Sequence, residues 1–241
     1  MTQIGMEDSS MESRQRIYAR VAGFLFLWLI VTGLAGALTI SHIVGSGIFA
    51  ERAKRVVASE HLYRLALSCE LVETVSAAVL AFSLYVTLRS VNKLLAQFAM
   101  YWRLGESFIG AGGMLGAYVT LRLYTSPQSV GALGAEQSQA LLGLADAAGF
   151  AAYNISAMFF SIGSILFCYL FFKSRYIPRT LSTFGIFASA IVTIMCFGSL
   201  ISPEHAATLQ YGWAPMAIFE VLAGFWLMFA VKIPATRPPR M

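Results

Sequence analysis

Charged residues are scarce in this sequence, where Asp, Glu, Lys and Arg together make up 12% of the 241 residues. Soluble domains usually carry roughly 25% charged residues, so the low share argues against an ordinary soluble fold. Hydrophobic residues make up 58% and the mean hydropathy is +0.69. A soluble core of this size would need far more polar surface to cover it. The composition therefore predicts a polytopic membrane protein.

Cysteine and histidine are also scarce, and their positions argue against metal and haem sites. The cysteines lie in apolar runs without a C-x-x-C partner, which is typical of small buried hydrophobic residues: Cys69, Cys168 and Cys196. The histidines fall at the expected outer interface: His42, His61 and His205. They show no H-E-x-x-H spacing, and none lies inside an expected helix as haem ligation requires. We therefore expect no disulfide, no metal and no cofactor.

Catalytic and nucleic-acid motifs are missing too. The sequence contains no Gly-rich phosphate-binding loop, no G-x-S-x-G motif and no plausible Ser/His/Asp set. Its net charge of +5 is not gathered into a basic cluster with interleaved aromatic residues, so we expect no nucleic acid partner. These absences leave open whether the protein is an enzyme.

Long apolar runs are what the sequence does contain. Each is close to the roughly 20 residues that span a bilayer, and inside a bilayer each must be helical because every backbone N–H needs an internal partner. The sequence therefore predicts an all-α bundle of six transmembrane helices over 21–231, between a segment 1–20 and a basic, proline-rich tail 232–241. The six runs are approximately 21–40, 62–88, 98–121, 147–172, 181–201 and 213–231.

The distribution of Lys and Arg predicts the orientation of this bundle. Eleven of them flank the runs on one side and four on the other, and the richer side is normally cytoplasmic. Both termini are therefore predicted to be cytoplasmic, with the bundle surrounded by membrane lipids. The run FFKSRYIPR is interpreted as an inner stop, with interfacial aromatics followed by basic residues facing anionic lipid and Pro178 turning the chain.

Two longer loops, 41–61 and 122–146, are predicted on the outer side. Each contains a stretch that we expect to form a short helix, at 49–57 and 136–144. The first could lie on the lipid headgroups as an amphipathic helix, or it could be a solvated connector.

The second run carries two carboxylates in its interior, Glu70 and Glu73. A charge at the bilayer centre costs at least about 2.5 kcal/mol, so an acid there requires an explanation. Residues three apart share one face of a helix, and lipid cannot solvate that face. Glu70 and Glu73 are therefore predicted to face other helices or a polar cavity.

A rise of about 1.5 Å per residue places Glu73 at nearly the same level as Glu106 on the next helix, with Arg103 one turn below, and predicts a cluster of these three residues. One arginine cannot neutralise all the nearby carboxylates, so at least one acid is expected to be held protonated. The third run is also rich in small residues, and its G-x-x-x-G pair, Gly112 and Gly116, is predicted to allow close packing of two helices.

A second polar layer is predicted nearer the outer face. Glu220 on the sixth run and Tyr153 and Asn154 on the fourth fall at about the depth of Glu70, and these four residues could line a cavity that opens outward. Two interpretations of the polar residues stay open. They could be interhelical hydrogen bonds that fix the packing, or they could form a ligand or proton site.

Several stretches along the chain are distinctive: R-x-A-G at 20–23, LYRLALSCELVE, TLRSVNKLLA leading into YWRLGES, MFFSIGSILFCYLFFKSRYIPRTLS, and FEVLAGFWL. Together they resemble a family of bacterial multi-pass membrane proteins described only as domain of unknown function 4386. The resemblance covers roughly 20–231 and is most specific at KSRYIPR. It implies a six-helix protein of the bacterial inner membrane, and it implies no reaction or substrate.

Three functions fit these residues. The first is a small transporter or binder of a small, largely apolar molecule, with Glu73 or Glu70 exchanging a proton; it predicts a cavity that reaches Glu70 and Glu220. The second is an intramembrane enzyme that uses a protonated Glu as general acid on a lipid or isoprenoid, which predicts an opening to lipid. The third is a structural or regulatory partner of another membrane protein. Substrate and oligomeric state are left open.

Overall fold

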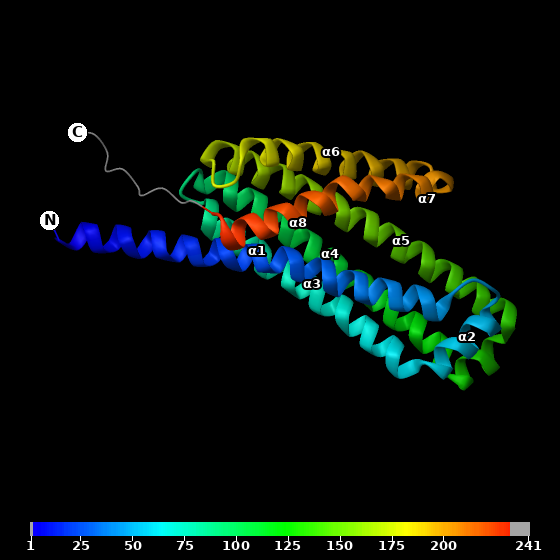
Figure 1. Cartoon of the computed structure of the whole chain (residues 1–241). Helices are drawn as coiled ribbons and strands as arrows, with labels where there is room; N and C mark the ends of the chain where they lie inside the picture. Colours follow the sequence, from blue (N-terminus) through cyan, green and yellow to red (C-terminus); the bar gives the residue numbers. More distant parts are fainter. Residues whose placement is uncertain (1, 232–241) are drawn as a thin grey trace.

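The computed structural model of the chain describes residues 2–231, with side chains from Ser13 onward except at 127–133 and 135. The predicted tail 232–241 lies outside the described residues. Within them the chain is helical and contains no strand, which confirms the all-α prediction (Figure 1). The elements are α1 (Thr2–Val44), α2 (Phe49–Ala58), α3 (Glu60–Leu88), α4 (Lys93–Thr125), α5 (Pro127–Ser174), α6 (Arg179–Ile201), η1 (Pro203–His205), α7 (Ala206–Leu209), η2 (Gln210–Gly212) and α8 (Trp213–Phe229).

The membrane prediction is supported by five stretches that are long and apolar enough to cross a bilayer. They are Ser13–Val44, Glu60–Leu88, Glu136–Ser174, Arg179–Ile201 and Pro203–Phe229. The chain is therefore a multi-pass membrane protein. Helix α4 is not among the five, because Arg103, Glu106 and several glycines lower the hydropathy of its middle, and its role as a sixth span stays a prediction.

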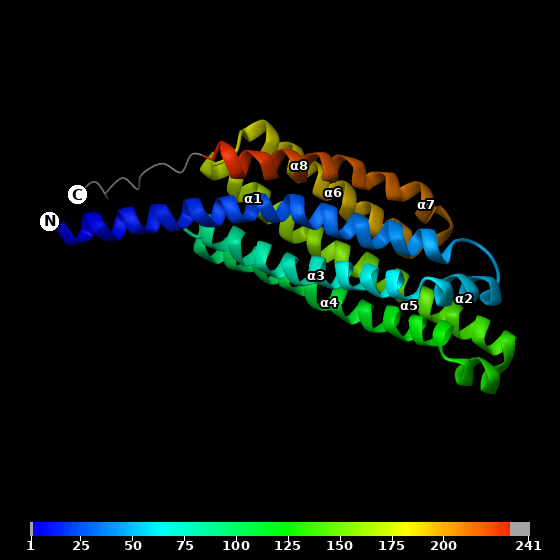
Figure 2. The same ribbon diagram turned by 60° about the horizontal axis from the view of Figure 1, so that its bottom comes forward.

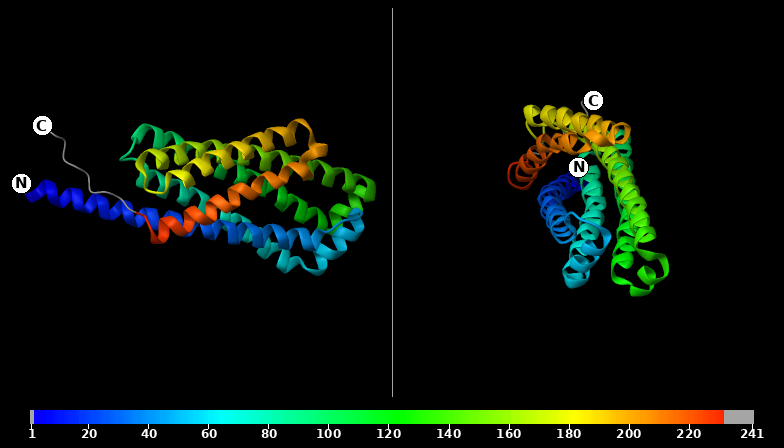
Figure 3. Two further views of the ribbon diagram at one scale, coloured as in Figure 1. Left: turned by 45° about the horizontal axis from the view of Figure 1, so that its top comes forward. Right: turned by 90° about the vertical axis from the view of Figure 1, so that its right-hand side faces the viewer.

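The long helices are arranged as a closed ring. Each packs against the next in the order α1, α3, α4, α5, α6, α8 and back to α1. Among the described residues, only α3 and α5 also touch across the ring (Figure 3, right). The axis of the ring therefore has to be filled by side chains or left open.

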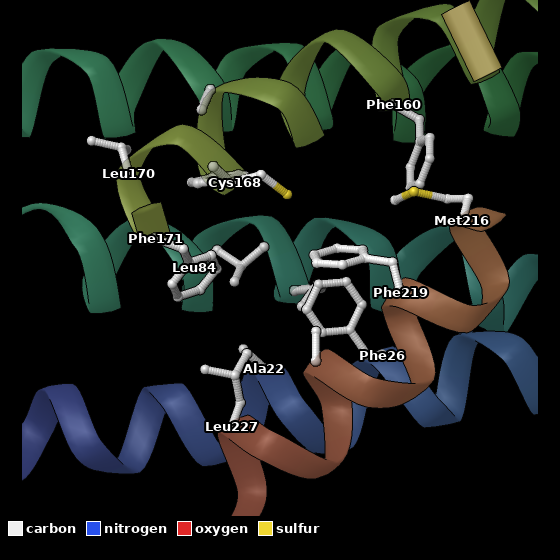
Figure 4. Close-up of a cluster of buried hydrophobic side chains, with 14 of the residues drawn as sticks. Ala22, Phe26, Leu84, Phe160, Cys168, Leu170, Phe171, Met216, Phe219 and Leu227 are labelled. Atoms are coloured by element: carbon white, nitrogen blue, oxygen red, sulfur yellow. The ribbon is translucent and has the colours of Figure 1, made fainter. Parts of the chain in front are cut away.

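One end of the ring holds the α3–α4 and α5–α6 turns, and we call it the turn end. Its axis is filled by a large apolar cluster, the turn-end core, to which α1, α3, α4, α5, α6 and α8 all contribute. Figure 4 shows members of this core, among them Phe26 of α1, Leu84 of α3, Phe171 of α5 and Phe219 of α8. Helix α1 runs unbroken from Thr2, so the predicted segment 1–20 is, from Thr2 onward, continuous with the first span. The start of α1 projects beyond the turn end (Figure 2), whereas Gln15 donates a 2.7 Å hydrogen bond to the Ser90 hydroxyl in the α3–α4 turn.

The α5–α6 turn covers part of the turn end. Arg175 adopts a left-handed backbone conformation with φ of 59°, which reverses the chain. The next two side chains, Tyr176 and Ile177, are 7% and 1% exposed and belong to the turn-end core. The FFKSRYIPR run therefore does more than end a span, because two of its residues are buried in protein instead of facing lipid.

The other end of the ring, the α2 end, differs from the prediction of a long loop at 122–146. Helix α4 continues to Thr125 and α5 begins at Pro127, with a kink at Gly134 where φ is 72°. The helix predicted at 136–144 exists, but it is part of α5. The two helices run side by side past the ends of α6 and α8 (Figures 1 and 2).

Helix α2, predicted at 49–57, is confirmed and caps this end. Its buried side chains, Phe49 and Val56, belong to a second apolar cluster, the cap cluster, with residues of α1, α3, α4 and α5. The guanidinium of Arg55 donates hydrogen bonds to the backbone carbonyl of Val44 at the end of α1, from Nε at 3.1 Å and from an Nη at 2.5 Å. The apolar face of α2 therefore packs on protein, and neither the headgroup-bound helix nor the solvated connector describes it.

The predicted close packing at the G-x-x-x-G pair is wrong. A Cβ added to Gly112 or to Gly116 would meet nothing within 4 Å. The tight helix contact lies instead between α1 and α8, where a Cβ on Gly23 would lie 2.6 Å from the carbonyl oxygen of Gly224. From this crossing α8 diverges from α1 toward the end of α6 (Figure 1).

Candidate functional site

The ring surrounds a partly open cavity of about 660 Å³ between its two apolar clusters. On α3, the lining residues fall within 70–77, between Leu67 of the cap cluster and Leu80 of the turn-end core. Helices α1, α4, α5 and α8 supply the other walls. The volume lies in the range of about 300–1,000 Å³ that is usual for small-molecule sites.

Six of the seven residues singled out in the sequence line this one cavity: Glu70, Glu73, Arg103, Glu106, Tyr153 and Glu220. The two polar layers predicted from depth are therefore one site. The exception is Asn154, which is 2% exposed and does not line the cavity. Its amide donates a 2.9 Å hydrogen bond to the carbonyl of Phe150 on its own helix, so a role for Asn154 in lining this cavity is excluded.

Arg103 is fixed at the floor of the cavity by contacts from two helices. Its side chain is 2% exposed, and its Nε lies 3.1 Å from a carboxylate oxygen of Glu106. One Nη donates a hydrogen bond of 3.3 Å to the Ser164 hydroxyl, and Cζ lies 4.3 Å from the ring centroid of Phe160. Gly163 makes room for the arginine stem, because a Cβ there would lie 2.8 Å from Arg103 Cγ.

The other three carboxyls are not paired in this way. Glu73, Arg103 and Glu106 were predicted to lie close together; within this group the ion pair joins Arg103 and Glu106. The nearest polar partner of Glu73 is the Thr74 hydroxyl at 3.5 Å, although the Arg103 charge is close enough to act on Glu73 and Glu220. Among the described residues, the carboxyls of Glu70 and Glu220 form no ion pair and no hydrogen bond. Their oxygens are thus free to meet a ligand or a proton.

Two glycines of α1 make room for the acids of α3, and the sequence reading missed both. A Cβ on Gly36 would lie 2.7 Å from Glu70 Cγ and 3.0 Å from the Ala66 carbonyl oxygen. A Cβ on Gly33 would lie 3.5 Å from Glu73 Cγ. The 33/36 spacing on α1 repeats the 70/73 spacing on α3, and this shared spacing is the signal that could have paired them.

An aromatic wall faces these acids from α5 and α8. The Trp213 ring lies 6.3 Å from that of Tyr153 and 5.6 Å from that of Phe160, centroid to centroid. The indole Nε1 of Trp213 is buried without a hydrogen-bond acceptor among the described residues. Phe160 and Trp213 had not been singled out in the sequence, because aromatic residues are common in every apolar run.

The cavity combines apolar walls with more acid than base. Its lining contains four carboxyls and one guanidinium, and its remaining residues are apolar, small or hydroxyl-bearing. In the described part of the chain, no three His, Cys, Asp or Glu side chains are grouped as metal ligands. The lining is therefore mostly apolar, with its ionisable acids and base limited to the four carboxyls, the guanidinium and Tyr153.

A family model described as a domain of unknown function, DUF4386, matches residues 21–230. The chain belongs to the DUF4386 family. The DUF4386 match includes all residues that line the cavity, from Leu29 of α1 to Glu220 of α8. No curated protein and no solved structure matches the chain.

Proposed function

We propose that this membrane protein binds and carries a small, largely apolar molecule in the cavity, with Glu70 or Glu73 as the proton-exchanging group. The observation that carries the proposal is a cavity of about 660 Å³ lined by Glu70 and Glu220, whose carboxyls have no ion pair or hydrogen bond among the described residues. A buried acid without a partner costs stability, so a packing role alone accounts poorly for these two residues.

The proposal includes six spans with both termini in the cytoplasm of a bacterial cell, so that the turn end is cytoplasmic and the α2 end faces outward. Lys and Arg support this orientation, since eleven flank the runs on the turn-end side and four on the α2 side. Helix α4 is the proposed sixth span. It turns Arg103 and Glu106 inward, and its outward face carries large exposed apolar side chains, among them Phe98, Phe108 and Leu115.

Proton exchange follows from the unequal environments of the acids. Glu106 has the guanidinium of Arg103 beside it, and this contact holds it as a fixed part of the floor. Glu70 and Glu73 are partly exposed to the cavity and lie one helical turn apart, so that ionising one disfavours ionising the other. A ligand that binds beside Glu70 and Glu73 changes their proton affinities, so protons are taken up or released when the ligand binds.

The first prediction is that filling the cavity abolishes binding. Purified protein in nanodiscs should bind at least one of two radiolabelled probes of similar size, neutral triphenylmethane or cationic tetraphenylphosphonium, saturably and above empty nanodiscs. Ala217→Trp, which puts a large ring into the cavity from α8, should lower the bound amount to background. Ala207→Trp, on the exposed surface of α7, is the matched control and should bind normally.

The same sample tests whether binding is coupled to the uptake or release of protons. Adding the bound probe to lightly buffered protein should change the pH measurably, and Glu70→Gln or Glu73→Gln should reduce the change. Neither probe saturating, or unchanged binding in Ala217→Trp, would contradict the proposed function.

Intramembrane acid–base catalysis is the second candidate. One observation favours it: a single cavity holds an acid paired with arginine, Glu106, and acids without a cation partner, Glu70 and Glu220. Acid–base enzymes separate the proton affinities of two carboxyls by giving them such unlike surroundings. Conversion of membrane lipid extracts by the protein, lost in Glu70→Gln, would support it, whereas unchanged lipid would leave binding as the function.

A further inference from the structure

We propose that the ligand of the cavity is an organic cation with an apolar body, held between Trp213 and the carboxylate of Glu220. The proposal rests on the proposed binding function and adds the charge of the ligand to it.

The first support is the charge of the lining. Among the ionisable acids and bases that line the cavity, Arg103 is the one base, and its contact at 3.1 Å is with Glu106. Glu70, Glu73 and Glu220 remain without a positive partner of their own. In a low-dielectric site such carboxyls can take up protons or they can take a cation, and both outcomes leave the site near neutrality.

The second support is the arrangement along α8. Trp213, Ala217 and Glu220 all line the cavity, and their spacing of four and three residues places them on one stripe of the helix. The stripe therefore presents an aromatic ring, then a small gap, then a carboxyl. Tryptophan is the aromatic side chain that attracts cations most strongly, and a carboxylate beyond it completes a two-sided cradle for a positive group.

The third support is that the cavity already stabilises a cation in this manner. The guanidinium of Arg103 lies 4.3 Å from the ring centroid of Phe160 and contacts the carboxylate of Glu106. Phe160 and Trp213 are neighbours, with ring centroids 5.6 Å apart. Trp213 and Glu220 repeat the combination of aromatic ring and acid that Phe160 and Glu106 provide for Arg103. No basic side chain that lines the cavity forms an ion pair with Glu220.

The geometry selects an organic cation over a metal ion. A divalent metal needs several oxygen ligands within about 2–2.6 Å, so its acids must converge on one point. The described acids of this cavity do not form such a group. They are spread over α3, α4 and α8 around a space of about 660 Å³, which fits a positive group with bulky apolar substituents.

Size-matched ions of opposite charge test the inference. Binding to the full-length protein in nanodiscs is measured for tetraphenylphosphonium, tetraphenylborate and triphenylmethane, with empty nanodiscs subtracted. We expect saturable binding of the phosphonium ion, and an affinity at least about tenfold above that for the borate ion and the neutral compound.

Two variants then test whether Glu220 and Trp213 bind the positive group. Glu220→Gln and Trp213→Leu should each weaken phosphonium binding by about tenfold, which corresponds to about 1.4 kcal/mol, and leave any residual binding of triphenylmethane unchanged. Glu204→Gln, an exposed acid outside the cavity, is the matched control. Equal losses for the charged and the neutral probe would show that Glu220 and Trp213 only shape the cavity.

The outcomes separate the two proposals. Triphenylmethane or tetraphenylborate binding as tightly as the phosphonium ion would overturn the cation inference and leave the binding function standing. Saturation by none of the three probes would overturn both. If Glu220→Gln does not fold, as judged by its melting curve, the comparison of probes on the unmodified protein and on Trp213→Leu decides.

Discussion

The two halves of the ring share α1, α3, α4, α5 and α8 but fill the axis differently. At the turn end, large side chains meet small ones: Phe219 of α8 lies so close to Gly185 of α6 that an added Cβ would be 2.5 Å from the Phe219 ring. Toward the α2 end, glycines again lie on the inner faces, but no large apolar side chain occupies the space beside Gly110 and Gly113. Small residues therefore allow tight packing at the turn end, where large side chains face them, and leave a cavity toward the α2 end, where none do.

Adjacent residues of α8 mark the boundary between the halves. Phe219 is 2% exposed and completes the turn-end core, whereas Glu220 lines the cavity. A helix can serve both halves because successive side chains point in directions roughly 100° apart. The comparison teaches that the charged side chains between the helices gather in the cavity, whereas the described residues of the turn end bury only uncharged polar groups such as Ser83, Thr87 and Ser182.

The largest effect is expected from Arg103→Met, which removes the cation at the boundary. Glu106 would then be buried beside apolar groups without its partner, and breaking a buried pair in this way costs about 3–5 kcal/mol. The measurement is the free energy of unfolding in detergent. Arg103→Met combined with Glu106→Gln should recover most of the loss, and a single variant as stable as the original would contradict the role of Arg103 as the buried counter-charge.

A smaller loss is expected from Gly185→Ala at the turn end. The new Cβ would lie 2.5 Å from the Phe219 ring and 2.7 Å from Cys168 Sγ, and overpacking of this kind costs about 1–3 kcal/mol. Gly112→Ala is the matched control, because nothing lies within 4 Å of its Cβ and alanine favours the helix by about 0.5–1 kcal/mol. Melting temperatures should fall for the first and rise for the second; equal shifts would show that the two halves are packed alike.

The smallest effect is expected where α1 faces the acids of α3. Gly36→Ala forces Glu70 to turn away or α1 to shift from Ala66, so the affinity for the bound probe should fall by less than about tenfold. Gly33→Ala meets Glu73 Cγ at an ordinary 3.5 Å and should bind normally. If both variants bind equally well, Glu70 does not need the space that Gly36 provides.

Much of the fold follows from the sequence because helices in lipid must satisfy their own backbone. The apolar runs gave the long helices to within a few residues except where polar stretches continue them. The stretch 122–146 contains Pro, Ser, Gly and two acids, which is typical of a loop, yet it is helical except at Ser126 and the kink at Gly134. Pro127 occupies the first turn of α5, where its missing N–H costs nothing, and α4 and α5 support each other along this extension.

The sequence predicts a depth for each residue of the candidate site but not the direction in which its side chain points. Depth depends only on the rise per residue, so the sequence predicted Glu73 and Glu106 at nearly one level and Glu220 nearer the outer face, and all three line the one cavity. Which way a side chain points depends on the rotation of its helix, and Tyr153 faces the cavity while its neighbour Asn154 does not. The cavity itself depends on which faces of five helices meet, and no pattern within a single run carries that information.

The crossing of α1 and α8 at Gly23 and Gly224 has a mechanical consequence. Two helices in backbone contact at one point can tilt about that point as a lever about its fulcrum. Trp213 lies eleven residues, or about 16 Å, along α8 from Gly224, so a tilt of about 10° there moves Trp213 by about 3 Å. A small tilt of α8 at the turn end therefore widens or narrows the cavity at the α2 end. The position of the Gly23–Gly224 contact along α8 determines how far Trp213 moves for a given tilt.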